Sequence, residues 1–383
     1  MTERLFDFDG YIWEFEATVL DVTECEEGYE TLLDRTAFSP EGGGQYSDVG
    51  EIDGIRVGAV RTREGEIYHV TEKPIEIGKK VVGKIDGDLR LRHLQNHTGE
   101  HIVSGIIYNE YGFNNVGFHL GVGYATMDVD GEIDKTALRE IERLANLAVA
   151  KNLSVKAYYP EQSELENMFY RSKLDLKENV RVVIIDGLDA CACCAPHVNK
   201  TGEIGMIKLL YCQKYKGGTR IFMKCGLDAL DEFNAEFDRA TAISNMISEP
   251  RENIDKGVKK LIEDIGAYKR EIYELKKQIL SFKTASAKIE NGRIIFIDDG
   301  MDMSELRAFV SARLDECEKF CVAFSGNDND GYTYVFGYKG EDFNEFVKNK
   351  IAALGEGGGG GKPPFAQGKV KCKKSDIDRL YLD

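Results

Sequence analysis

The sequence lacks the features that would place it in a membrane or outside the cell. Its 383 residues contain no apolar run of about 18 residues, the length that spans a bilayer as a helix. The N-terminal stretch MTERLFDFDG has no apolar core of the kind that a signal peptide needs. We therefore expect a cytoplasmic protein with no membrane contact.

Positive charge is also in short supply. Acidic residues outnumber basic residues by 66 to 50, and the formal net charge is −16. Phosphate contacts need positive surface, so this balance argues against indiscriminate binding of nucleic acid. Two stretches without any acid, Met206–Lys224 and Gly357–Lys374, each carry five basic residues. If the protein binds RNA, these are the first places where we expect contact.

Histidine is scarce, and half of it is concentrated in one place. Only six histidines occur, and three of them, His93, His97 and His101, fall within nine residues. Nine cysteines also occur, and three of these crowd into positions 191–194. In a protein expected to be cytoplasmic, such clusters indicate metal binding or catalysis more than a disulfide framework.

Hydrophobic patterning predicts an α+β protein of several domains. Short β-rich runs separated by turns predict an N-terminal small β-barrel. Helical and strand-like segments then alternate, which predicts a central α/β domain. A helical segment and a C-terminal α/β domain with a glycine-rich loop, Gly355–Gly361, complete the chain. The expected bounds of the four parts are 1–88, 89–228, 229–288 and 289–383.

The helical segment contains a regular apolar seam. From Ile254 to Ile279, apolar residues recur at alternating steps of four and three, with lysine and glutamate around them. This is a heptad pattern of more than three repeats. It predicts a coiled coil, either as a homodimer of the chain or folded back antiparallel. The alternative is a long helix that lies on its own domain.

The histidine spacing suits a metal site on a helix. A helical pattern covers Leu91–Tyr108, and two imidazoles four residues apart emerge one turn apart on the same face. All three histidines cannot bind one ion, because His93 and His101 lie about 12 Å apart along a helix axis. The spacing alone leaves open which adjacent pair binds.

A second pair of ligand types follows about a hundred positions later. Cys193 and His197 have C-x3-H spacing, which lets a thiolate and an imidazole reach one ion from a compact turn. With two histidines from a helix they supply the borderline and soft ligands typical of zinc. Four protein ligands would equally suit a closed structural zinc site.

The segment His97–His101, HTGEH, also satisfies the inverted zincin motif H-x-x-E-H. In that alternative the chain is a zinc metallopeptidase, and Glu100 is the general base. It requires a downstream glutamate as third ligand and leaves Cys193 and His197 without a role.

Several motifs together resemble those of alanyl-tRNA synthetases and the related free-standing AlaX editing proteins. TAFSPEGGGQ at Thr36–Gln45 resembles their T-x-F-Y-P-E-G-G-G-Q segment, and HTGEH resembles their H-T-x-x-H helix. Cys193 and His197 match the C-x3-H element that precedes TGEIG at 201–205. The glycine run followed by Lys362, Pro363, Ala366 and Gln367 resembles the end of the synthetase C-terminal domain. The resemblance spans nearly the whole chain in matching order.

Two departures from the family pattern are visible. Ser39 stands where the family usually has tyrosine, and the C-x3-H element lies in a triple-cysteine cluster instead of C-G-G-T-H. Cys191 or Cys194 could therefore replace Cys193 as the thiolate ligand.

The resemblance implies a trans-editing hydrolase that deacylates mischarged tRNA(Ala), with Ser-tRNA(Ala) as the first expected substrate and Gly-tRNA(Ala) as the second. No aminoacylation domain precedes the barrel, so hydrolysis independent of ATP is expected. The resemblance also selects His97 and His101 over His93. One Zn²⁺ per chain is then expected on His97, His101, Cys193 and His197. A non-catalytic, zinc-stabilised tRNA-binding protein is the remaining alternative.

Further site residues are expected around this metal. Gln45 ends a glycine run that lets backbone approach a ligand closely, so it is a candidate for hydrogen bonding to the substrate; a plain β-turn is the alternative. His119 is expected either to contact the amino acid or nearby RNA, or to be structural. The expected residues are Gln45 and Glu100 for catalysis, Thr36, Gly44, Gln45 and His119 for substrate, and Gly359, Gly360, Gly361, Lys362, Gln367 and Lys369 for tRNA.

Overall fold

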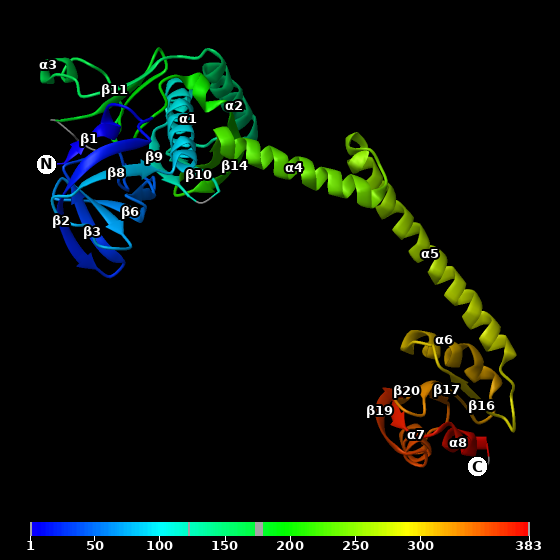
Figure 1. Cartoon of the computed structure of the whole chain (residues 1–383). Coiled ribbons are helices and arrows are strands. Elements are labelled where there is room, and N and C mark those ends of the chain that lie inside the picture. The colour runs from blue at the N-terminus through cyan, green and yellow to red at the C-terminus, as the bar shows by residue number, and fades with distance from the viewer. Residues whose placement is uncertain (1, 122, 173–178, 382–383) are drawn as a thin grey trace. The chain divides into compact units, whose positions relative to one another are not determined.

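The computed structural model describes residues 2–121, 123–172 and 179–381 of the chain (Figure 1). The chain forms two compact units, Met1–Ile243 and Ser244–Asp383. Each unit encloses hydrophobic clusters of its own. The predicted mixed α+β class and the long helix are confirmed, whereas the four-part division of the chain stays a prediction. Among the helices described, none is long and apolar enough to cross a membrane.

The first unit begins with a closed barrel of antiparallel strands in the order β2-β3-β7-β6-β5-β8. Side chains alternate between the barrel interior and solvent, as the period of two along a strand requires; Phe15, Ala17 and Val19 of β2 are buried. A short parallel pair, β1 (Glu3–Arg4) and β4 (Arg35–Thr36), lies beside it. The barrel strands are β2 (Glu14–Cys25), β3 (Gly28–Leu33), β5 (Gly50–Ile52), β6 (Ile55–Arg63), β7 (Glu66–Thr71) and β8 (Lys80–Ile85).

Helix α1 (Gly87–Tyr111) follows the last barrel strand directly. It begins where the Asp86 side chain accepts a hydrogen bond from the Leu89 amide, and it ends at Gly112, which takes the left-handed conformation that glycine adopts most easily. These signals make the helix longer at both ends than the predicted Leu91–Tyr108. Most of its residues between Arg90 and Ile107 are buried, because other elements surround it.

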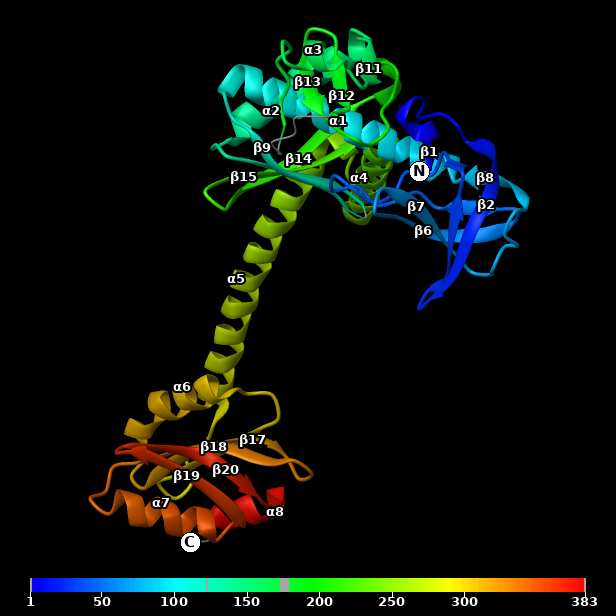
Figure 2. The same cartoon turned by 90° about the vertical axis from the view of Figure 1, so that its left-hand side faces the viewer.

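Two sheets flank α1 in the first unit (Figure 2). An antiparallel four-stranded sheet, in the order β14-β15-β10-β9, packs one face on α1 and on α2 (Lys135–Ala150). An antiparallel three-stranded sheet, in the order β11-β12-β13, contacts α1 through β13. The strands are β9 (Asn115–Leu120), β10 (Ala125–Val129), β11 (Val155–Tyr158), β12 (Val182–Ile185), β13 (Asp189–Ala192), β14 (Ile207–Tyr215) and β15 (Gly218–Cys225). A short helix, α3 (Gln162–Leu165), precedes β12.

Arg90 of α1 joins the helix to the barrel. Its guanidinium donates to Asp48 through Nε at 2.8 Å and to the carbonyl oxygens of Gly10 and Ala37 at 2.9 and 2.6 Å. Arg90 is 0% exposed and Asp48 is 1% exposed. Asp48 also accepts from the Ser39 amide, and its own amide donates to the Ser39 carbonyl. The loop from Ser39 to Asp48 is therefore held at both of its ends and tied to α1.

Helix α4 (Gly226–Ile247) crosses the boundary between the units, and α5 (Ile254–Ser286) belongs to the second. The α5 seam is exposed along most of its length, including Leu261, Ile265 and Ile272. Near its end, Leu280 packs against the cluster around α6 (Met303–Arg313). The middle of the predicted seam thus has no covering element in the described part of the second unit.

The second unit contains a five-stranded sheet in the order β16-β17-β18-β20-β19, parallel between β16 and β17 and antiparallel elsewhere. Helix α6 covers one face over β16, β17 and β18, while α7 and α8 cover the other face. The remaining bounds are β16 (Ile294–Asp298), β17 (Phe320–Asn327), β18 (Gly331–Tyr338), α7 (Phe343–Ala352), β19 (Glu356–Lys362), β20 (Phe365–Lys371) and α8 (Lys374–Ile377).

The predicted glycine-rich loop at Gly355–Gly361 is wrong, because most of it forms the edge strand β19, paired with β20 along its whole length. Pairing with β20 satisfies the backbone groups of these glycines, although glycine has a low intrinsic preference for strands. The absence of side chains permits close approach: a Cβ on Gly359 would lie 2.4 Å from both the Gln367 carbonyl oxygen and the Tyr334 hydroxyl.

Candidate metal centre

Four predicted ligands converge in the first unit. His97 and His101 come from α1, and Cys193 and His197 come from the segment that follows β13; one ligand atom from each lies within 4.8 Å of the others. The Cys193 Sγ and His97 Nε2 atoms are 3.4 Å apart. His93 is not part of the group, so the geometry selects the pair that the spacing left open. The group could bind a metal ion such as zinc.

Each imidazole in the group uses its Nδ1 atom for a contact away from the centre. The Nδ1 partners are Gln45 Oε1 for His97 at 2.8 Å, Asp189 Oδ2 for His101 at 3.4 Å, and Thr98 Oγ1 for His197 at 3.2 Å. Such contacts orient metal-binding histidines and leave Nε2 as the coordinating atom. His197 Nε2 is buried and has no hydrogen-bond partner in the described structure, which is costly for a polar atom unless a further ligand meets it.

The residues present fit a zinc ion. Zinc bonds of about 2.0–2.3 Å to nitrogen and thiolate sulfur need only a small contraction of the group. Burial opposes ionisation of the Cys193 thiol, but His97 and His197 outweigh it and hold the thiol pKa well below its usual range. Burial also lowers the pKa of His197 to about 3, so this imidazole is neutral and able to donate its lone pair.

The electrostatics around His101 also favour a cation. Burial lowers the pKa of this imidazole, yet its hydrogen bonds to Asp189, Cys191 and Cys193 outweigh burial and raise the pKa well above its usual value. A positive charge is therefore stabilised at this point of the centre. A bound metal ion would supply that charge in place of a proton.

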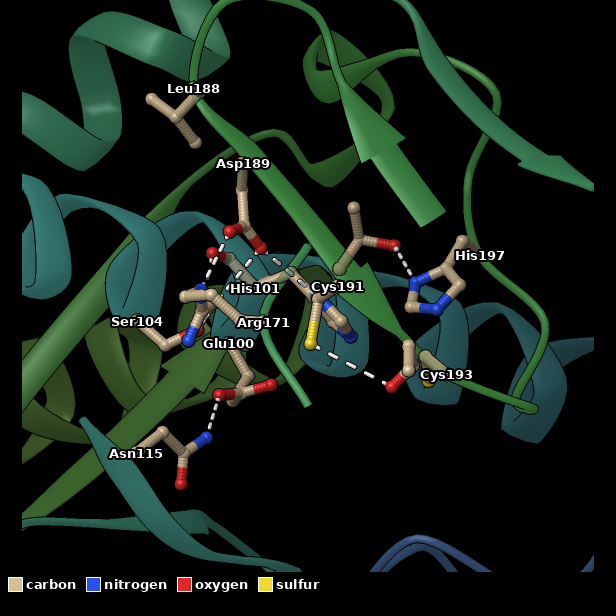
Figure 3. A network of polar contacts seen from close by, with 12 residues as sticks. Glu100, His101, Ser104, Asn115, Arg171, Leu188, Asp189, Cys191, Cys193 and His197 are labelled. Atoms are coloured by element: carbon tan, nitrogen blue, oxygen red, sulfur yellow. Dashed lines mark hydrogen bonds and ion pairs between the residues drawn. The ribbon is translucent and has the colours of Figure 1, made fainter. Parts of the chain in front are cut away.

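Only one residue of the cysteine cluster enters the four-ligand group. Cys191 lies beside His101 and Asp189, one strand repeat before Cys193, and Figure 3 shows both cysteines near His101. Cys194 is exposed, and burial of its neighbourhood together with nearby Cys193 raises the pKa of its thiol. Because side chains alternate along an extended segment, Cys191 and Cys193 face α1 and Cys194 does not.

The glycine loop of the barrel reaches the centre through Gln45. Backbone hydrogen bonds in both directions between Gly42 and Gln45 close a tight turn, and the Gly44 carbonyl accepts from the Leu120 amide of β9. Gly44 has φ +84°, and a Cβ there would lie 2.1 Å from the Phe118 carbonyl oxygen, so no other residue fits. The β-turn is thus present, and it places the buried Gln45 side chain on His97. Contact between Gln45 and substrate stays a prediction.

The other predicted site residues lie at different distances from the centre. Thr36 is buried inside the barrel region, where its hydroxyl bonds to His69 Nε2 at 2.8 Å. His119 is exposed on β9. Glu100 is buried next to the group and accepts a hydrogen bond from Asn115 (Figure 3). Their roles in substrate binding or catalysis stay predictions.

Sequence reasoning missed Asp189 and Arg171, which support the ligands. Asp189 bonds to His101 and also forms a bidentate ion pair with Arg171, at 2.7 and 2.8 Å. The Arg171 guanidinium further donates to Ser104 of α1 at 2.7 Å. Strand alternation could have pointed to Asp189, which stands two and four residues before Cys191 and Cys193. No local signal could have found Arg171, because its partners come from other elements.

Comparison with known proteins is consistent with this geometry. Residues 180–222, which contain Cys193 and His197, match the family model described as "Threonyl and Alanyl tRNA synthetase second additional domain". The alanyl-tRNA editing protein AlaX-L of Pyrococcus horikoshii is 28% identical over 400 aligned residues, which cover 100% of this chain and 98% of that protein. The chain is a full-length homologue of the AlaX-L editing protein.

Alanine–tRNA ligases are also similar to the chain. The ligase of Halorubrum lacusprofundi is 31% identical over 387 residues, covering 96% of the chain and 42% of the ligase. The ligase of Halobacterium salinarum is 32% identical over 361 residues, covering 88% of the chain and 38% of the ligase. The chain thus spans less than half the length of these ligases and is related to the editing and C-terminal region of alanyl-tRNA synthetase.

We expect the purified chain to hold one zinc ion, and substitutions of the four converging ligands should release it. Cys193→Ser and His197→Ala should lose the metal, because each removes one of four converging ligands. Gln45→Ala should keep the fold and weaken zinc affinity by about 10–100-fold, because it removes the partner that orients His97. Elemental analysis and competition with a chelator measure these effects.

The matched control is Cys194→Ser, which changes an exposed thiol one residue away and should retain full zinc content. Retention of zinc by Cys193→Ser together with its loss in Cys191→Ser would show that the thiolate has been assigned to the wrong cysteine.

Proposed function

We propose that the chain is an aminoacyl-tRNA deacylase that acts in trans on mischarged tRNA(Ala), as a carboxylic ester hydrolase. The observation that carries this proposal is the convergence of His97, His101, Cys193 and His197 in a full-length homologue of an alanyl-tRNA editing protein. The homology supports deacylase activity, and the ligand group supports a zinc-dependent reaction.

The substrates follow from a limit on discrimination by binding. A pocket that accepts alanine cannot strongly reject a side chain that adds one hydroxyl or lacks one methyl group. tRNA(Ala) charged in error with serine or glycine must therefore be removed at a second, hydrolytic site. We therefore assign Ser-tRNA(Ala) as the first substrate and Gly-tRNA(Ala) as the second.

The residues around the ligand group have distinct tasks in this proposal. A bound zinc ion supplies Lewis-acid chemistry, by activating water or by anchoring the aminoacyl group. Gln45 and Asp189 hold the imidazoles of His97 and His101 in one orientation. Glu100 stands beside the group with one carboxylate oxygen engaged by Asn115, which leaves the other oxygen to take up a proton. Thr36 stabilises the barrel next to the group through its hydrogen bond to His69. Gly44 lets the Ser39–Asp48 loop lie close to β9.

The metallopeptidase alternative has less support. It requires a glutamate as third ligand, whereas Cys193 and His197 complete the group among the described residues. The non-catalytic alternative, a zinc-stabilised tRNA-binding protein, makes the same zinc prediction and differs only in hydrolysis.

We expect the purified chain to hydrolyse Ser-tRNA(Ala) much faster than Ala-tRNA(Ala), and a chelator to abolish the reaction until zinc is restored. Glu100→Gln should lower kcat by about 10²–10⁴-fold if Glu100 transfers the proton, while zinc content stays unchanged. Cys194→Ser serves as the matched variant with unaltered activity. The decay of radiolabelled aminoacyl ester measures all of these rates.

An unchanged ester half-life with zinc-loaded protein would favour the tRNA-binding alternative. Peptide cleavage that disappears in Glu100→Gln would favour the metallopeptidase.

We further propose that the open face of β19 and β20 in the second unit contacts tRNA. Gln367 and Lys369 are exposed on β20 and lie opposite Gly360 and Gly358 of β19, where a Cβ would meet nothing within 4 Å. Lys362 shares this face at its end. A flat surface of backbone with lysines at its rim lets phosphates and base edges approach closely. Gly359 and Gly361 lie on the opposite face and permit the packing of β19 on β20.

Lys369→Glu should raise the KM for Ser-tRNA(Ala) with little change in kcat. The slope of the logarithm of the tRNA-binding constant against the logarithm of the salt concentration should become shallower by about one. Lys348→Glu, on the exposed side of α7, is the matched charge reversal and should have no effect. An unchanged KM for Lys369→Glu would contradict a tRNA contact at this face.

We also propose that the α5 seam joins two copies of the chain as a coiled-coil homodimer. The specific support is the exposure of Leu261, Ile265 and Ile272 along a heptad pattern. Such a stripe is stabilised when a second helix covers it.

Light scattering should therefore show a dimer for the wild-type chain and a monomer for Ile265→Asp, which introduces a charge into the seam. Lys277→Asp, on the opposite side of α5, should remain dimeric. A wild-type chain that stays monomeric at tens of micromolar would rule the dimer out.

A further inference from the structure

The outer face of the four-stranded sheet in the first unit carries aromatic side chains that no core explains. Helices α1 and α2 cover the inner face, where Met127, Leu209 and Ile221 are buried. On the outer face, Tyr211 is 51% exposed and Tyr124 is 45% exposed. Exposed positions on such a sheet are usually polar, and large aromatic rings grouped there mark a binding surface more often than a structural one.

Three of these rings contact one another around Phe222, which is itself buried at 8% exposure. Tyr211 and Phe222 stack with centroids 4.3 Å apart and an interplanar angle of 21°, and Tyr124 meets Phe222 edge-on at 5.4 Å. The strand register aligns Tyr211, Phe222, Thr126 and His119 in one row across β14, β15, β10 and β9. The row therefore crosses the whole width of the sheet.

The row ends beside the candidate metal centre. His119 contacts the exposed ring of Tyr46 at 5.6 Å, and Tyr46 directly follows Gln45, the partner of His97. The residue before His119, Phe118, lies on the other side of β9 and meets the His97 ring at 5.1 Å. The aligned side chains and the ligand group thus lie on opposite faces of β9, and the barrel loop meets this strand through Gly44. A nucleotide strand bound along the row would end at His119 and Tyr46, next to this loop.

Electrostatics narrow down what could bind there. The basic residues of the acid-free stretch Met206–Lys224 are mostly paired with acids from other elements. RNA contact along this stretch stays a prediction. Four of the five make such pairs: Lys208 with Glu142, Lys214 with Glu132, Arg220 with Asp128, and Lys224 with Glu232. The surface therefore offers ring faces more than free charge, which suits ligands that bind by stacking.

We propose that the exposed rings of Tyr211, Tyr124, His119 and Tyr46 form a stacking platform for unpaired nucleotides at the 3′ end of an RNA substrate. The buried Phe222 supports the first two rings through its contacts with them. These five residues are here called the aromatic row. This proposal rests on the proposed deacylase function, because the ester bond lies at that end of the RNA. Every base presents a π-face, so aromatic rings on an open sheet bind single strands with little sequence preference. The row leads such a strand toward the edge of β9 and the ligand group.

The test uses the full chain and a fluorescein-labelled single-stranded RNA of eight nucleotides, with binding measured by fluorescence anisotropy. Tyr211→Ala and Tyr124→Ala should each weaken binding by about fivefold or more, because each removes one stacking surface. Tyr211→Phe keeps the ring and should bind like the wild type. Phe8→Ala, at a largely exposed ring outside the row, is the matched control. A blunt RNA duplex should compete poorly.

In hydrolysis of Ser-tRNA(Ala), the same tyrosine variants should raise KM and leave kcat nearly unchanged, because they are remote from the ester. Unchanged octamer affinity in both variants would overturn the platform, even if hydrolysis proceeds normally. A change in self-association without a change in RNA affinity would also overturn it and identify a protein contact surface instead. Octamer binding through the row by a chain that hydrolyses no ester would retain the platform and reject the deacylase.

Discussion

A buried ion pair between Arg90 and Asp48 is the constraint on which the candidate centre depends. Arg90 belongs to the helix that carries two ligands, and Asp48 ends the barrel loop that carries Gln45. Removal of either partner would leave an uncompensated buried charge, so the barrel and the helix keep one relative arrangement. That arrangement brings Gln45 to His97, two helical turns beyond Arg90. The barrel is therefore part of the centre's architecture, although it supplies none of the four converging ligands.

The ligand group shows how few segments are needed to orient a candidate metal site. Each histidine is held through Nδ1 by a different segment: the barrel loop for His97, β13 for His101 and α1 itself for His197. These contacts free the Nε2 atoms to face Cys193, whose thiolate the surrounding imidazoles stabilise. The ion pair with Arg171 in turn holds Asp189, the partner of His101, in place. These contacts hold the three imidazoles in one orientation.

The acidic composition also bears on the proposed RNA contacts. The chain has a net charge of −16, and most lysine and arginine side chains of Met206–Lys224 pair with its own acidic residues. The outer face of the four-stranded sheet is left with aromatic rings. In the second unit, lysines remain exposed beside the glycine strand β19. Stacking in the first unit and phosphate contacts in the second would divide the recognition of one RNA between different physical interactions.

Local patterns in the sequence determined much of the candidate centre. The spacings of His97 with His101 and of Cys193 with His197 fix which side chains share a face or a turn, and the mixed α+β class and the long helix follow from periodicity alone. Only the tertiary structure decided the rest. It excluded Cys194 from the group and brought Asp189 to His101. It also paired Arg220 with Asp128 across two strands and turned a glycine run from a predicted loop into β19. The physical reason is range: periodicity reports neighbours within a helix or strand, whereas charge pairing, strand register and support for a ligand depend on residues that meet only when distant segments pack.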